Sequence, residues 1–433
     1  MSVAILSFLY RNLVLPLVVI LLRILKPIFP VKLRRIIDDR DEYPQLKKYT
    51  QPPVLIHAAS GELEYAKPLI RWLRTHSPGT PIVLTYFSPS ALRLIEGLPV
   101  DEVLPLPFDL TRDQSDFLDR LRPSMVLVAR TDVWPEMARQ CRIRDIPVIL
   151  FSATFSRPLA RKFWMSRTLD RWRFENLRLV APVSDEDETN FRSLKLSTPT
   201  AVLGDTRYEQ VIERLKDPKK LPFTIENDAR FTGVLGSTWF EDDQVWIDAL
   251  TEPDLRANFR WIWVPHEVSL RKIQELIEQL KTSGFKVEKL SDIDTWRSDI
   301  LVVDRTGLLA ELYRRADVAF VGGSFRAKVH SVMEPLAAGC PVVLGPHCDN
   351  NREAQEFRRL PLIQDQRIVS IANDGEGLRA WLRGIHPHLG NRRLREQIVQ
   401  KVEERAHVTE KLMAELIERK IFEPRADAPT ENS

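Results

Sequence analysis

The sequence is poor in cysteine, and its charges almost cancel. Only three of its 433 residues are cysteines, Cys141, Cys340 and Cys348. So few thiols, odd in number and without zinc-binding spacing, exclude a disulfide framework and favour a reducing compartment. The 63 Lys and Arg residues stand against 60 Asp and Glu residues. Because this excess is so small, we do not expect a nucleic acid as a partner.

Several motifs of nucleotide chemistry are also missing. The chain has no paired-aspartate metal motif and no phosphate-binding loop of the Walker type, which argues against a metal-dependent transferase and against an ATPase. We therefore expect no metal and no cofactor. What is present is an ordinary globular composition, with 44% hydrophobic and 28% charged residues. A length of 433 residues predicts two to three folding units.

The amino-terminal segment is the one strong compositional anomaly. Residues 3–29 are almost wholly apolar, and their only charges are Arg11, Arg23 and Lys26. A bilayer core needs about 20 apolar residues. Since Arg11 and Arg23 can each reach an interface, a tilted spanning helix and a helix lying in the interface both remain open. The alternative is a buried first helix of a soluble domain.

The residues that follow this segment indicate its orientation. No small-residue cleavage site follows, which argues against a removed signal peptide. Lys26, Lys32, Arg34 and Arg35 come just after the apolar run, and the positive-inside bias then keeps the rest of the chain in the cytoplasm. We therefore predict a membrane anchor over residues 1–35.

Beyond the anchor, short apolar runs alternate with segments long enough for a crossover helix. This pattern predicts an α/β fold with parallel sheets. The runs of the first half are Val54–Ala58, Ile82–Phe87, Val103–Leu106, Met125–Ala129, Val148–Phe151 and Leu179–Val183. Those of the second half are Phe231–Leu235, Trp261–Val264, Val287–Leu290, Ile300–Val303, Val318–Val321 and Val342–Leu344.

The alternation stops once, in the polar stretch near residues 210–228, and then restarts. We therefore predict two Rossmann-like domains, over residues 36–215 and 225–420, followed by a disordered tail over 424–433. Such sheets bind ligands beyond the carboxyl ends of their strands, so we expect a cleft between the two domains.

The first run ends in a motif that can carry acid–base chemistry. His57-Ala-Ala-Ser-Gly-Glu62 leads from a strand into a helix, so the Glu62 carboxylate would lie at the helix start. A carboxylate there can remove a proton from an attacking hydroxyl group. The alternative is that Glu62 only complements the helix dipole.

The second half carries motifs suited to a nucleotide. Val321-Gly-Gly-Ser324 ends a strand, and backbone amides at such a place can hold a phosphate. His330-Ser-Val-Met-Glu334 would then open a helix with His330 and Glu334 on one face, where Glu334 can accept two ribose hydroxyls. Gly345-Pro-His347 ends the next strand, and residues 350–353 open another helix.

Together these motifs resemble those of the 3-deoxy-D-manno-octulosonic acid (Kdo) transferases. The resemblance rests on residues 57–62, Thr131-Asp-Val-Trp-Pro135, 321–324, 330–335 and 345–353, in that order. It implies a membrane-anchored, inverting glycosyltransferase of the GT-B fold. The implied donor is CMP-Kdo, the acceptor is a lipid A precursor, and the location is the cytoplasmic face of the inner membrane.

The resemblance also implies roles for individual residues. Glu62 would be the catalytic base of a single displacement. The substrate-binding residues would be Ser60, Gly61, Arg130, Asp132 and Arg207. The donor nucleotide would be bound by Ser237, Thr238, Pro265, His266, Gly322, Gly323, Ser324, His330, Ser331, Glu334, His347, Asn350 and Glu353.

The chain departs from the family pattern at several of these positions. The loop before Glu62 is one residue shorter, and Arg130 stands where the family has glutamate. Thr154 replaces an arginine, which Arg130 would restore to the same region. His266 also replaces an arginine, and Ser331 replaces an asparagine. These changes keep two alternatives open: a related GT-B transferase with another nucleotide sugar, and a membrane-anchored homologue without catalysis.

Overall fold

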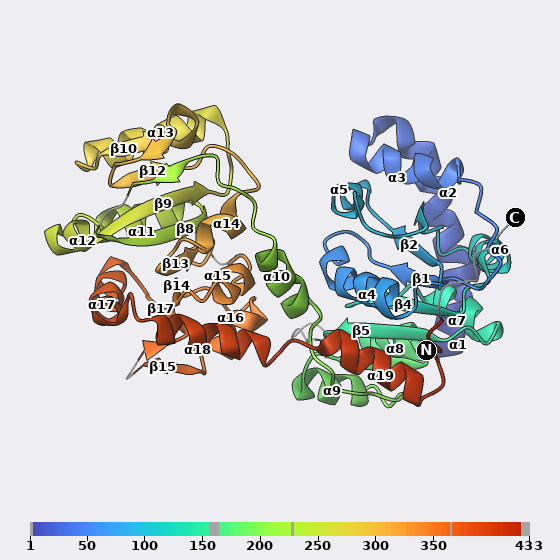
Figure 1. The fold of residues 1–433 in the computed structure, drawn as a ribbon. Coiled ribbons are helices and arrows are strands. Elements are labelled where there is room, and N and C mark those ends of the chain that lie inside the picture. Colours follow the sequence, from blue (N-terminus) through green and yellow to red (C-terminus); the bar gives the residue numbers. More distant parts are fainter. Residues whose placement is uncertain (1–2, 156–163, 227–228, 327, 364–365, 426–433) are drawn as a thin grey trace, which may run out of the picture. The chain divides into compact units, whose positions relative to one another are not determined.

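The computed structural model describes residues 3–155, 164–226, 229–326, 328–363 and 366–425. The chain forms two compact units. Met1–Gln210 and Arg405–Ser433 form the first unit, and Val211–Glu404 forms the second (Figure 1). The prediction of two α/β domains is confirmed, and every apolar run named above contains a strand.

The first unit is built on a parallel six-stranded sheet with the order β3-β2-β1-β4-β5-β6. Its strands are almost wholly buried because helices cover both faces, which explains their continuous apolar sequences. The strands are β1 (Val54–His57), β2 (Ile82–Tyr86), β3 (Glu102–Pro105), β4 (Met125–Ala129), β5 (Val148–Ala153) and β6 (Leu179–Pro182). The helices that follow them are α4 (Leu63–His76), α5 (Leu92–Ile95), α6 (Thr111–Leu121), α7 (Pro135–Ile143), α8 (Trp164–Phe174), α9 (Asp185–Arg192) and α10 (Arg207–Lys216).

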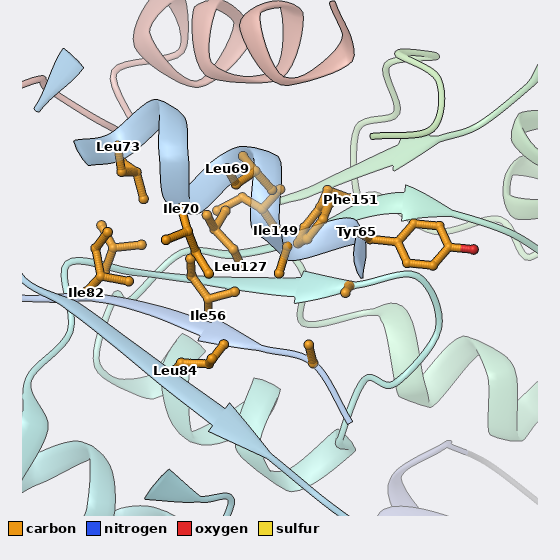
Figure 2. Close-up of a cluster of buried hydrophobic side chains, with 14 of the residues drawn as sticks. Ile56, Tyr65, Leu69, Ile70, Leu73, Ile82, Leu84, Leu127, Ile149 and Phe151 are labelled. Carbon is orange, nitrogen blue, oxygen red and sulfur yellow. The ribbon is translucent and has the colours of Figure 1, made fainter. Parts of the chain in front are cut away.

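The core of the first unit lies where α4 packs on this sheet. Leu69, Ile70 and Leu73 repeat at helical spacing and contact strand residues such as Ile56 and Leu127, all fully buried (Figure 2). At roughly 1.5–3 kcal/mol for each buried side chain, this layer is a main source of stability. It fixes the start of α4 at the carboxyl edge of the sheet.

The amino-terminal segment is helical and largely exposed. Its parts are α1 (Val3–Leu9), the π turn η1 (Tyr10–Val14), α2 (Leu15–Leu25), η2 (Lys26–Ile28) and α3 (Val31–Asp41). Val3–Ile28 is long and apolar enough to cross a membrane, and an 18-residue stretch of it has a mean hydropathy of 2.2 and is 6% buried. The interpretation as a buried first helix is therefore wrong. The predicted end of the anchor at residue 35 falls inside α3.

The second unit contains a seven-stranded parallel sheet with the order β10-β12-β9-β8-β13-β14-β17. Its strands are β8 (Phe231–Thr238), β9 (Phe259–Pro265), β10 (Val287–Lys289), β12 (Ile300–Val302), β13 (Val318–Val321), β14 (Val342–Leu344) and β17 (Val369–Ile371). Two small sheets pair β7 (Thr224–Ile225) with β11 (Thr295–Trp296), and β15 (Pro361–Ile363) with β16 (Gln366–Arg367). The sequence did not indicate β17, because three residues with a central serine lack an apolar run.

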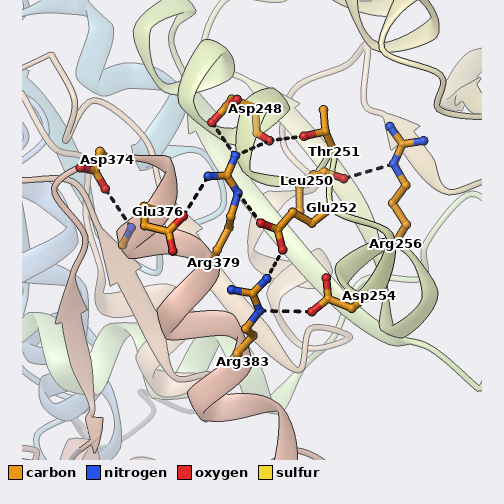
Figure 3. Close-up of polar contacts among 11 residues, drawn as sticks. Asp248, Leu250, Thr251, Glu252, Asp254, Arg256, Asp374, Glu376, Arg379 and Arg383 are labelled. Carbon is orange, nitrogen blue, oxygen red and sulfur yellow. Dashed lines mark hydrogen bonds and ion pairs between the residues drawn. The ribbon is translucent and has the colours of Figure 1, made fainter.

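Helices surround this second sheet, and one contact between them is polar. They are α11 (Phe240–Ala249), α12 (Pro253–Asn258), α13 (Leu270–Thr282), α14 (Leu309–Tyr313), α15 (Met333–Ala337), α16 (Arg352–Phe357), α17 (Gly375–Ile385) and α18 (Arg392–Glu403). Arg379 on α17 donates to Asp248 at 2.7 Å, and Arg383 pairs with Asp254 at 3.2 Å (Figure 3). Because these pairs are exposed, they set the register of α17 more than they stabilise it.

The carboxyl-terminal boundary differs from the prediction. Helix α19 (Val408–Glu418) belongs to the first unit, where Leu412, Met413 and Leu416 are buried in the core. The assignment of 225–420 to one domain is therefore wrong. The apolar spacing of α19 is the same whether the helix packs on the second unit or returns to the first. The first part of the predicted tail is also ordered, because the Arg425 amide donates to Ser77 Oγ at 2.6 Å. Residues 426–433 lie outside the described residues.

Candidate active site

Both large sheets change winding direction at one point, and the predicted residues follow the strands there. In the first unit the point lies between β1 and β4, and in the second between β8 and β13. Ligands of open α/β sheets bind beyond the carboxyl ends of strands at such points. Glu62 and Arg130 follow β1 and β4, whereas Ser237 lies at the end of β8 and Gly322 follows β13.

Glu62 stands directly before α4, as the sequence predicts. It is half-buried, and its Oε2 accepts a hydrogen bond from the Ser60 amide at 3.1 Å. The neighbouring loop fixes this turn, because the amides of Phe87 and Ser88 donate to the Ala59 carbonyl at 3.1 and 3.0 Å. A Cβ added to Gly61 would meet nothing within 4 Å. The shortened loop therefore leaves open space beside Glu62.

Asp132 is held from inside the unit by a histidine. His57 Nε2 lies 3.0 Å from Asp132 Oδ2, which also accepts a hydrogen bond from Trp134 Nε1 at 3.2 Å. Since a carboxylate only accepts, His57 Nε2 carries the proton. Burial raises the pKa of Asp132, but the bonds from His57 and Trp134 and the charge of Arg173 outweigh it, so the pKa lies below its usual value. The fully buried His57 gave no sequence signal beyond its place in the motif.

Arg130 and Arg207 meet over one aromatic ring. Their guanidinium carbons lie 5.3 and 5.8 Å from the ring centroid of Tyr65, in the first turn of α4. Arg130 has φ = 65°, a left-handed conformation that costs a non-glycine residue about 1 kcal/mol or more. Its amide is fixed on the Phe151 carbonyl at 2.8 Å, and its side chain forms no hydrogen bond or ion pair with the described residues. The Tyr65 ring is buried and extends away from the other labelled side chains of the cluster (Figure 2).

The glycine loop of the second unit is held by a buried aspartate that the sequence analysis missed. Asp242 on α11 accepts hydrogen bonds from the amides of Gly323 and Phe325 at 2.7 and 3.1 Å. The Gly322 amide donates to the Gly236 carbonyl at 2.8 Å. The amides of Gly322, Gly323 and Phe325 therefore already have partners within the protein, and the phosphate-binding role of this loop stays a prediction. Burial raises the pKa of Asp242.

The two glycines are also required by backbone packing. A Cβ on Gly322 would lie 2.1 Å from the Ser237 carbonyl oxygen. One on Gly323, which has φ = 83°, would lie 2.1 Å from the Lys328 carbonyl oxygen. Ser324 is fully buried, and its hydroxyl accepts a hydrogen bond from the Gly345 amide at 2.7 Å. This loop therefore shapes the edge of the sheet from within.

An aromatic stack lies at the same edge. The His266 ring stacks on Trp239 with centroids 4.3 Å apart and on His330 at 4.5 Å. Trp239 Nε1 donates to His330 Nε2 at 3.2 Å, and Arg326 covers the Trp239 ring at 4.3 Å. Burial, together with the charge of His266 and Lys328, lowers the pKa of His330 to about 4. His330 is therefore neutral at pH 7.

Thr238 lies behind this stack. It is 2% exposed, and its hydroxyl accepts a hydrogen bond from Trp263 Nε1 at 3.1 Å. Trp263 Nε1 also donates to Asp243 at 2.7 Å, and burial raises the pKa of Asp243 to about 6. Thr238 therefore supports the edge of the sheet, and it also lines a pocket there with Trp239 and Pro265.

The remaining predicted donor residues are more dispersed. Helix α15 begins only at Met333, so His330 and Glu334 do not share a helical face, and that prediction is wrong. Glu334 instead pairs with Arg214 at 2.8 Å. Ser331 Oγ accepts a hydrogen bond from the Met333 amide at 3.3 Å. The positions near the ends of β9 and β14 are exposed or half-buried: Pro265, His347, Asn350 and Glu353.

Two doubly wound parallel sheets, each with polar groups at its switch point, have the architecture of the GT-B fold. The fold is similar to a putative UDP-N-acetylglucosamine 2-epimerase from Listeria monocytogenes, with a TM-score of 0.61, 13% identity, and coverage of 88% of this chain and 100% of that chain. A UDP-GlcNAc 2-epimerase from Neisseria meningitidis gives a TM-score of 0.58, 12% identity, and coverage of 85% and 100%. At these identities the likeness concerns the fold alone.

Sequence comparisons point to one family. Residues 35–210 match the family described as 3-deoxy-D-manno-octulosonic-acid transferase (kdotransferase). The chain is 26% identical to the 3-deoxy-D-manno-octulosonic acid transferase of Haemophilus influenzae over 80% of this chain and 82% of that protein. It is 28% identical to that of Bordetella pertussis, over 70% and 73%. Residues 35–210 therefore form a Kdo transferase domain, and the chain is a glycosyltransferase that is similar to Kdo transferases over most of its length.

Proposed function

We propose that this protein transfers Kdo from CMP-Kdo to a lipid A precursor at the cytoplasmic face of the inner membrane, with inversion at the anomeric carbon. Similarity to the Kdo transferases supports the reaction, and the apolar amino-terminal helix supports the membrane setting. The first unit would bind the acceptor. The edge of the second unit around Trp239, His266 and His330 would bind the nucleotide.

The observation that carries the proposal is that one acid and two cations lie near the first turn of α4. Glu62 precedes α4, and Tyr65, which lies in the first turn of α4, carries Arg130 and Arg207 against its ring. Among the described residues, the Ser60 amide is the single hydrogen-bond partner of the Glu62 carboxylate. The carboxylate thus keeps the capacity to accept a proton from an acceptor hydroxyl. Charge-assisted bonds from the two arginines suit the carboxylate of an acidic sugar.

In this mechanism Glu62 takes the proton from the acceptor hydroxyl, and the oxygen of that hydroxyl attacks the anomeric carbon of Kdo. CMP leaves in the same step. Asp132 would not contact the reacting atoms, because its carboxylate is held by His57 and Trp134. We assign it a positioning role for the loop that carries Arg130.

Replacing the base tests this function. Detergent-solubilised protein is incubated with a lipid A precursor and with CMP-Kdo generated in place, and the lipid is weighed by mass spectrometry. Glu62→Gln should lower turnover by roughly 100-fold or more and leave donor binding near normal, because only the proton acceptor is lost. Glu64→Gln is the matched control. Glu64 lies one residue beyond the start of α4, and its carboxylate pairs with Lys67 at 2.5 Å. Normal turnover in Glu62→Gln would refute the assignment.

A transferase with a different nucleotide sugar is the second candidate. It is favoured by His266, which stacks between Trp239 and His330 where the resemblance would place a phosphate-binding arginine. The same assay with other nucleotide sugars, each compared by the mass that it adds to the lipid, separates the two. A gain from a donor other than CMP-Kdo, with no gain from CMP-Kdo, would support this candidate.

A further inference from the structure

A surface helix of a soluble protein packs its apolar side on the protein and turns its polar side to water. The amino-terminal helix has the opposite arrangement. Its outward face is largely apolar, with Phe8, Leu17 and Ile24 exposed by 60%, 52% and 66%. The exposed Asn12 side chain donates back to the Phe8 carbonyl at 2.8 Å. The polar side chains Tyr10 and Arg11 turn toward the first unit instead. They lie in the π turn η1, a local widening of the kind that is frequent at functional sites.

These polar side chains fasten the start of the helix to the first unit. The Tyr10 hydroxyl donates to the buried Asp109 at 3.2 Å, and the Tyr10 ring packs edge-on against Trp172 on α8, with centroids 4.8 Å apart. Arg11 Nε lies 3.8 Å from the carboxylate of Glu136, which is on α7. The start of the helix is therefore docked through side chains on α7 and α8 and the loop after β3.

The end of the helix is fastened through α3. Arg23 pairs with Asp41 at 2.7 Å, and Lys26 pairs with Asp38. Arg40 on α3 is 6% exposed and donates to the Phe87 carbonyl at 3.2 Å. Midway along the helix, Val19 is 2% exposed. One side of the helix is thus covered from its start to its end.

This distribution conflicts with a helix that crosses the bilayer. From Ser7, which is buried, to Lys26 the helix rises by about 28 Å at 1.5 Å per residue. The hydrocarbon core of a bilayer is about 30 Å thick. A spanning helix that kept these contacts would draw Asp109, Glu136 and their surroundings into hydrocarbon, where unpaired polar groups are very costly.

We infer that Val3–Ile28 lies in the plane of the membrane interface, with its apolar face in an anionic bilayer surface and the first unit on the aqueous side. The covered side faces the protein, and the exposed apolar side needs a nonaqueous partner. Lys32 and Arg34 are exposed in α3, directly after the helix, and attract anionic head groups. A bilayer with anionic lipids therefore complements this surface in both polarity and charge.

This placement also brings the surface of the membrane to the carboxyl edge of the first sheet. Arg40 binds the Phe87 carbonyl, and the Phe87 amide donates to Ala59, three residues before Glu62. A lipid acceptor would thus reach Glu62 from the interface without leaving the membrane. This consequence rests on the proposed function, whereas the topology itself does not.

Labelling of single cysteines tests the topology in the full chain. Ser2→Cys and Arg34→Cys place thiols directly before the helix and at an exposed position after it, and the three native cysteines are buried. A membrane-impermeant maleimide is added to bacterial spheroplasts, which expose the periplasmic face, and to inverted vesicles, which expose the cytoplasmic face. Both thiols should react in inverted vesicles at least tenfold more than in spheroplasts. Labelling of Ser2→Cys from the periplasmic side alone would overturn the inference.

Binding to vesicles checks the apolar face independently of enzymatic activity. The full chain should float with phosphatidylcholine vesicles that contain phosphatidylglycerol, and Leu17→Glu should reduce the bound fraction at least fivefold. Leu270→Glu, which places the same charge on an exposed leucine of α13, is the matched control. Equal flotation of Leu17→Glu and the unsubstituted chain would contradict the interfacial placement. Because neither readout is turnover, failure of the proposed function would leave both unchanged.

Discussion

Arg130 shows how a single residue can alter a site without altering the fold. Its left-handed backbone and its place over Tyr65 bring a cation to the carboxyl edge of β4, and Thr154 lies beyond the end of the neighbouring β5. The sequence analysis placed Arg130 in the substrate site and expected it to restore a lost arginine. The resemblance also placed Arg207 in this site, but the shared contact with the Tyr65 ring was not foreseen, because the three positions are far apart in sequence.

Removing the Arg130 cation should weaken binding of the acidic sugar. Because Arg207 remains, we expect Arg130→Gln to raise KM for the donor about tenfold, the loss of roughly one charge-assisted hydrogen bond, with a smaller change in kcat. Steady-state kinetics at fixed lipid concentration measure both. Arg71→Gln on α4, which loses a bond to Gln210 at 2.8 Å, serves as the control. An unchanged KM in Arg130→Gln would remove this residue from the site.

The loop after β13 shows the limit of sequence patterns at this scale. A Gly-Gly-Ser sequence after a strand is typical of phosphate-binding loops, and the sequence predicted one. The amides of Gly322 and Gly323 have partners within the protein, Gly236 and Asp242, and both glycines are needed for the close approach of other backbone segments. An acid from another helix decides this outcome, and no local pattern contains it.

At the scale of elements, the contact between η1 and α7 depends on an acid with an altered pKa. Asp109 is fully buried, accepts hydrogen bonds from the amides of Glu136 and Met137 at 2.9 and 2.8 Å, and accepts another from Tyr10. Burial raises its pKa to about 7, although the amide bonds lower it. In the unfolded chain the pKa of an aspartate is about 3.9.

This difference predicts the direction of a pH dependence. Between about pH 4 and pH 7 the folded protein binds a proton that the unfolded chain lacks, so the contribution of Asp109 to the unfolding free energy falls as pH rises and levels off above 7. Asp109→Asn cannot titrate. The stability advantage of the unsubstituted protein over this variant should therefore shrink by about 1–3 kcal/mol from pH 5 to pH 8. Urea unfolding at the two pH values measures it, and an advantage that grows with pH would contradict the assignment.

At the scale of the whole molecule, the chain returns to its first unit at the end. Helix α19 buries Leu412, Met413 and Leu416 in the core beneath α4. A sequence pattern records that this helix has an apolar face but not which domain the face packs against. The predicted domain boundary at residue 420 was wrong for this reason.

A truncation after Glu404 should therefore destabilise the unit at the other end of the sequence. Loss of three buried side chains, each worth about 2–5 kcal/mol, is comparable with the whole stability of a domain. We expect the first unit to become sensitive to limited proteolysis. A chain ending at Arg425 keeps α19 and is the matched control. Equal resistance of the two chains would show that α19 is dispensable.

The sequence by itself determined the elements and their class. Continuous apolar runs define strands that are buried on both faces, so the predicted runs contain the strands of both sheets, apart from the short β17 and the two small sheets. It also determined the apolar amino-terminal helix and the place of Glu62 before α4, since both depend on neighbours along the chain.

Only the tertiary structure decided what depends on residues far apart in sequence. It paired His57 with Asp132, placed Arg130 and Arg207 over Tyr65, and closed the glycine loop on Asp242. It also laid the polar side of the amino-terminal helix on the first unit. The physical reason is the same in each case. The position and role of a side chain are fixed by the group that satisfies its charge or hydrogen bonds. In a doubly wound sheet that group comes from a strand or helix elsewhere in the chain.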